Sequence, residues 1–184
     1  MEVESSARPR FGTSIHITAI DGIVNVNSLF TLAVFIGLAW NPTDLNNTLV
    51  NDPNCVAGRR IAEDLVSFHV YSFSSFLFSS IIALSLKQAI RIAKSNGGPI
   101  MFHGAALMAR VNKTALRVAI VVSAAGSVSG CVFLMLALVN VVQIKLGILS
   151  CGSVYSYGAV VPLFILVPVG LLIYVCMVLY ALTA

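Results

Sequence analysis

The sequence has few charged side chains, and it has almost none across four long stretches. Only 10% of its 184 residues are Asp, Glu, Lys or Arg, whereas 58% are hydrophobic. Soluble domains carry about 25% charged residues, so a soluble globular fold is excluded. Each uncharged stretch can supply the roughly 20 residues of a transmembrane helix. We therefore predict an all-α membrane protein, a four-helix bundle with spans at about 20–40, 65–86, 118–142 and 154–183, preceded by a polar tail at 1–19.

The sequence also lacks the short motifs that indicate catalytic, metal-binding or nucleotide-binding sites. It contains no HExxH, CxxC, phosphate-binding loop, dinucleotide fingerprint or GxSxG elbow. The three histidines, His16, His69 and His103, fall on different sides of the predicted membrane, so they cannot share one metal ion. We therefore predict no enzymatic activity, no cofactor and no metal site.

Most of the basic residues lie in the connector between the second and third spans, residues 87–117. This connector holds six of the eleven basic residues and no acid: Lys87, Arg91, Lys94, Arg110, Lys113 and Arg117. With Arg8 and Arg10, the side of the membrane that contains the connector and both termini has eight basic residues. The other side has three: Arg59, Arg60 and Lys145. The positive-inside rule then predicts that both termini and the connector are cytoplasmic.

The basic connector has a topological role that needs no further partner. Since its charges flank membrane segments, we do not expect nucleic-acid binding. Anionic lipid headgroups are a compatible partner for residues 87–117, at about 1 kcal/mol for each charge near the surface. The lipid bilayer itself is the partner that composition requires.

Two features favour an oxidising environment for the other side. Asn46 begins an Asn-Asn-Thr acceptor pattern for N-glycosylation. Cys55 and Cys151 fall in the two outer loops, and a disulfide between them would persist there. These features predict the secretory pathway or the plasma membrane as the location.

The first span begins with unusually polar residues. Asp21 is the only acid within a predicted span, and Asn25 and Asn27 follow about one turn deeper. One interpretation is structural: an interfacial acid paired with a basic residue of the connector, and amides that fix helix packing. The alternative is a polar vestibule that handles protons or ions.

Small residues mark the second and third spans. Ser123, Gly126 and Gly130 lie on one stripe of the third span, and Gly126 and Gly130 form a GxxxG pattern. Ser72, Ser75 and Ser79 share a face of the second span. Such faces allow close helix contact and hydrogen bonds across it, so we predict a helix-packing role. A groove for a lipid or ligand is the alternative.

The start of the first span, Thr18-Ala-Ile-Asp-Gly-Ile-Val-Asn-Val-Asn-Ser-Leu-Phe-Thr31, resembles the opening of a group of small plant membrane proteins. These four-span proteins are called maternal effect embryo arrest 60-like, and the similarity covers residues 18–38. The resemblance implies a plant membrane protein, and it supplies no activity and no site residue.

Two functions fit these observations. The first is a non-enzymatic scaffold or accessory subunit that binds other membrane proteins or itself through helix–helix contacts. The second is a small channel or transporter with a polar path near Asp21, Asn25 and Asn27. Four helices leave little room for a pore, so the second function would require oligomers.

Overall fold

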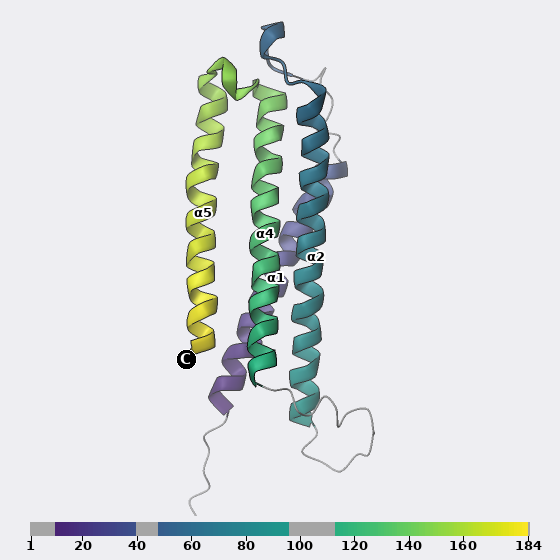
Figure 1. The fold of residues 1–184 in the computed structure, drawn as a ribbon, viewed down its shortest axis with the longest axis vertical. Coiled ribbons are helices and arrows are strands. Elements are labelled where there is room, and N and C mark those ends of the chain that lie inside the picture. Colours follow the sequence, from purple (N-terminus) through teal and green to yellow (C-terminus); the bar gives the residue numbers. More distant parts are fainter. Residues whose placement is uncertain (1–9, 40–47, 96–112, 184) are drawn as a thin grey trace, which may run out of the picture.

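The computed structural model describes residues 10–39, 48–95 and 113–183, which form four long α-helices and two short 3-10 turns (Figure 1). The elements are α1 (Arg10–Ala39), η1 (Pro53–Cys55), α2 (Arg59–Ser95), α4 (Lys113–Leu146), η2 (Leu149–Cys151) and α5 (Val154–Thr183). All four long helices are long and apolar enough to cross a membrane. The predicted all-helical fold with four candidate spans is therefore confirmed.

Three of the helices extend beyond the apolar stretches that predicted them. α1 begins at Arg10, within the stretch predicted as a tail, and α2 runs from Arg59 to Ser95 rather than from 65 to 86. α4 is longer at both ends than 118–142, whereas α5 ends where predicted. Hydropathy marks only the part of a helix that suits hydrocarbon, while the backbone hydrogen bonds continue into polar sequence.

The helices are arranged as a layer with one oblique member. α2, α4 and α5 run side by side, and α1 crosses behind them at a clear angle (Figure 1). The start of α1 and the end of α5 lie at the same end of the bundle, which we call the inner end (Figure 1). The two 3-10 turns lie at the opposite, outer end. Pro162 and Pro168 lie within one uninterrupted α5.

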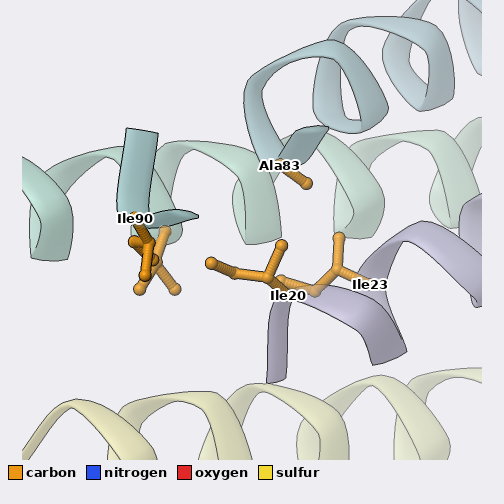
Figure 2. Close-up of a cluster of buried hydrophobic side chains, with 5 residues drawn as sticks. Ile20, Ile23, Ala83 and Ile90 are labelled. Carbon is orange, nitrogen blue, oxygen red and sulfur yellow. The ribbon is translucent and has the colours of Figure 1, made fainter. Parts of the chain in front are cut away.

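Three apolar clusters hold the bundle together along its length. At the inner end, Ile20 and Ile23 of α1 pack against Ala83 and Ile90 of α2, together with Ile120 of α4 (Figure 2). The middle cluster is Val34, Phe76 and Cys131, and the outer cluster is Ala57, Ala62, Leu65, Ala137 and Ile144. None of these buried residues comes from α5, which contributes partly buried side chains such as Leu171, Tyr174 and Val178.

Several predictions concern residues outside the described ranges. They are the tail up to residue 9, the glycosylation pattern that begins at Asn46, the connector from 96 to 112, and His103 within that connector. They remain predictions.

Candidate functional site

A hydrogen-bonded junction of polar side chains lies in the middle of the bundle, where α1, α2 and α4 meet. Asn27 of α1 is fully buried, and its amide nitrogen donates to Ser79 Oγ of α2 at 2.7 Å. Ser127 Oγ of α4 donates to the amide oxygen of Asn27 at 2.5 Å. One side chain of α1 thus bonds to both neighbouring helices.

Two serines complete the junction by reciprocal bonds between α2 and α4. Ser79 Oγ donates to the Ser123 carbonyl at 2.6 Å, and Ser123 Oγ donates to the Ser79 carbonyl at 2.9 Å. About two turns along α2 and α4, Ser72 Oγ donates to the Gly130 carbonyl at 2.8 Å. Hydrogen bonds of this kind are worth up to about 1–2 kcal/mol each between membrane helices, so the junction specifies how the helices pack.

The GxxxG pattern of α4 is the contact that permits this close approach. A Cβ at Gly126 would lie 3.0 Å from Ser79 Cβ, and a Cβ at Gly130 would lie 2.8 Å from the Phe76 ring. Phe76 is fully buried and stacks on Phe30 of α1, with 5.3 Å between ring centroids. Ser123, Gly126 and Gly130 therefore all lie against α2 inside the bundle.

The three polar residues predicted to act together near the start of α1 are separated by the structure. Asp21 forms an ion pair with Lys87 of α2, the pairing that the structural interpretation predicts. Asn27 is in the buried junction, whereas Asn25 is exposed on the outward side of α1. Because a helix turns 100° per residue, positions 25 and 27 point about 160° apart. Within one chain, Asn27 therefore faces away from Asn25, and the three side chains do not line one surface.

The outer end is closed by a disulfide and by backbone hydrogen bonds. Cys55 and Cys151 are joined, with their Cα atoms 5.8 Å apart, so the predicted bridge is present. Beside it, Leu49 N donates to the Lys145 carbonyl and Ile148 N donates to the Cys55 carbonyl, each at 3.0 Å. The first bond satisfies the Lys145 carbonyl, one of the groups that the end of α4 leaves unpaired, and the second ties the chain after α4 to η1.

The start of α5 also helps to close the outer end. Ser156 Oγ lies 3.0 Å from the Leu146 carbonyl and 3.1 Å from the Gly147 carbonyl. Gly147 adopts a φ of 99°, a conformation that side chains rarely tolerate, and this lets the chain turn between α4 and η2. A cavity of about 470 Å³ opens beside the bridge, lined in part by Leu49, Asp52 and Tyr155.

His69 is buried where α1 crosses the outer part of α2. Its Nδ1 lies 2.9 Å from the Leu65 carbonyl, and a Cβ at Gly37 would lie 2.8 Å from its Nε2. Among the described residues, no group of three or more His, Cys, Asp or Glu side chains is placed to hold a metal ion. The ring of His69 packs against Gly37, where α1 and α2 cross.

Comparison with protein-family models, curated proteins and solved structures finds no match.

Sequence reasoning missed two members of the site. Ser127 lies between the two glycines of the GxxxG pattern, one position outside their stripe, so attention to the glycines alone passes over it. A serine adjacent to a small-residue stripe, opposite an asparagine of another span, was the available signal. Gly37 lies in the smoothly apolar half of α1, and only the position of His69 reveals its role.

Proposed function

We propose that this chain is a multi-pass membrane protein that acts as a non-enzymatic scaffold or accessory subunit. One observation carries the proposal: the buried polar residues of the junction, Asn27, Ser79, Ser123 and Ser127, bond to one another across α1, α2 and α4. Polar groups used in this way fix a rigid framework. The outward faces of α1 and α5 remain available for lipid or for other membrane proteins.

The proposed orientation has both termini and the connector in the cytoplasm. The eight-to-three distribution of basic residues supports this orientation. The disulfide also supports it, because the bridge is at the outer end and disulfides persist in oxidising compartments. Secretory-pathway or plasma membranes provide such a compartment.

Anionic lipids are the proposed partner of the inner end. Arg91 and Arg117 are exposed there, while Lys87 is engaged with Asp21. The two exposed guanidinium groups are suited to phosphate oxygens, which they bind through paired N–H donors.

The deciding experiment is chemical crosslinking of the full chain in native membranes, followed by affinity isolation and mass spectrometry. A scaffold gives reproducible species above the monomer mass, containing either a second membrane protein or a second copy. A chain recovered only as monomer would contradict the proposal. As a parallel arm, purified protein in liposomes is tested for ion flux. Flux that Asn27→Leu abolishes would favour the channel function instead.

A further inference from the structure

The outward face of α1 has the residue spacing of a helix pair. Residues 22, 25, 29, 32 and 36 recur at intervals of three and four, the spacing of the core positions in a left-handed pair of helices. All five are exposed, and the large ones are 69%, 59% and 54% exposed at Leu29, Leu32 and Ile36. We call this set the α1 seam: Gly22, Asn25, Leu29, Leu32 and Ile36.

The polar member of the α1 seam makes this face different from one that only contacts lipid. Asn25 is five residues inside the candidate span that begins at Ile20, about 8 Å along the helix. No part of the described chain forms a hydrogen bond with its side chain, whereas Asn27 bonds to α2 and α4. An amide at this depth costs free energy unless another polar group bonds to it.

We infer that the α1 seam pairs with the α1 seam of a second copy of this chain. A carboxamide has both a donor and an acceptor, so two Asn25 side chains related by a two-fold axis satisfy each other. Gly22 has no side chain to hold a second helix away, and its position is open, with nothing within 4 Å of where a Cβ would stand. The GxxxG pattern is occupied by Phe76 and Ser79 within the bundle, so it does not compete for this role.

This inference deepens the proposed function, on which it rests, by naming the partner and the surface. A polar residue in a helix–helix seam fixes register and the number of strands. In the dimer, Asn25 therefore sets which turns of the two α1 helices meet, and the leucines and isoleucine beyond it supply the packing.

Cysteine crosslinking tests the seam directly. In a Cys176→Ser background, Leu29→Cys is compared in native membranes with Leu166→Cys, a position on α5 that is 68% exposed against 69% for Leu29. Oxidation is expected to convert the Leu29→Cys chain to a disulfide-linked homodimer and to leave the Leu166→Cys chain monomeric.

Energy transfer between labelled full-length chains in liposomes then measures the contribution of Asn25. Asn25→Leu is expected to weaken association about tenfold, and Asn25→Gln to retain most of it. The matched control is Ser28→Leu, because Ser28 is exposed beside the seam and bonds only to the Val24 carbonyl of its own helix. This control is expected to leave association unchanged.

Equal crosslinking at Leu29→Cys and Leu166→Cys, or identical dilution curves for Asn25→Leu and the native chain, would overturn the inference and assign the seam to lipid. A Leu29→Cys chain that crosslinks to a different protein would also overturn it, while leaving the proposed scaffold function intact. Recovery of monomer alone, in this assay and in chemical crosslinking, would reject both the pairing of the α1 seam and the proposed scaffold function.

Discussion

α4 and α5 are both long apolar helices, yet α4 is far more buried in the bundle than α5, which is mostly exposed. In the most apolar stretch of α4, 44% of the residues are buried inside the protein, against 6% in α5. α4 carries the small and polar residues of the junction, whereas α5 presents mainly valine, leucine and isoleucine. Lipid tails are as apolar as leucine, so hydrophobicity alone gives a helix no reason to be inside. Close packing and hydrogen bonds decide which helix is central.

The largest predicted effect concerns how α5 is attached. Joint replacement Cys55→Ser and Cys151→Ser opens a loop of 96 residues, and we expect it to lower the free energy of unfolding by about 2–4 kcal/mol. Hydrogen exchange should increase first in α5 and later in α4, because α5 has little packing to replace the bond. Cys176→Ser is the control, since this exposed thiol is free. Equal hydrogen exchange in α4 and α5 would contradict the difference in packing between these two helices.

The second prediction compares one glycine from each helix. Gly130→Ala should destabilise the protein by about 1–3 kcal/mol, because the new methyl group overlaps the buried Phe76 ring. Gly170→Ala on α5 meets nothing within 4 Å, so it should be neutral or stabilise by up to about 1 kcal/mol. Thermal unfolding in detergent measures both. A similar loss for the two variants would contradict the contact explanation, because helix propensity favours alanine over glycine at both positions.

The third prediction concerns the polar junction. Asn27→Leu removes the two side-chain bonds from α1 to α2 and α4, and we expect a loss of about 1–2 kcal/mol in unfolding free energy. Asn25→Leu, measured in detergent at a dilution where chains do not associate, should change stability by less than about 0.5 kcal/mol. Equal losses for the two asparagines would mean that the junction adds no specific stability.

The smallest predicted effect is at the inner ion pair. Asp21→Asn should cost at most about 1 kcal/mol, because Asp21 and Lys87 are 42% and 23% exposed and solvent weakens their attraction. The cost should shrink further in 1 M salt, where charges are screened within about 3 Å. Thermal unfolding in low and high salt checks this. A loss that does not depend on salt would indicate packing rather than charge as the cause.

The sequence predicted the number of helices because long uncharged stretches have few other solutions in a membrane. It also placed Cys55 and Cys151 in loops of the same side, which was enough to predict their bridge. Helix ends were predicted less well, because Arg59 and Glu63 prefer a loop by composition but form an i,i+4 pair on a helix exposed to solvent.

The polar site was only partly predictable. Asn25 and Asn27 look equivalent in the sequence, since both are amides at nearly one depth. The direction each faces depends on the rotation of α1, and that rotation is fixed by Ile20, Ile23 and Val34 packing against other helices. Contacts between residues far apart in the chain therefore separate a buried asparagine from an exposed one.

The oblique course of α1 has a consequence for the thickness of the surrounding bilayer. The candidate span of α1 has 20 residues, about 30 Å of helix, and its tilt shortens the distance it covers along the bundle (Figure 1). The span of α5 has 27 residues, about 40 Å, and runs along the bundle. Lipid should therefore be compressed beside α1 and stretched beside α5, at a fraction of a kcal/mol for each ångström. If a second chain covers α1, less lipid is compressed there and the mismatch energy falls. This energy favours association of two chains through α1.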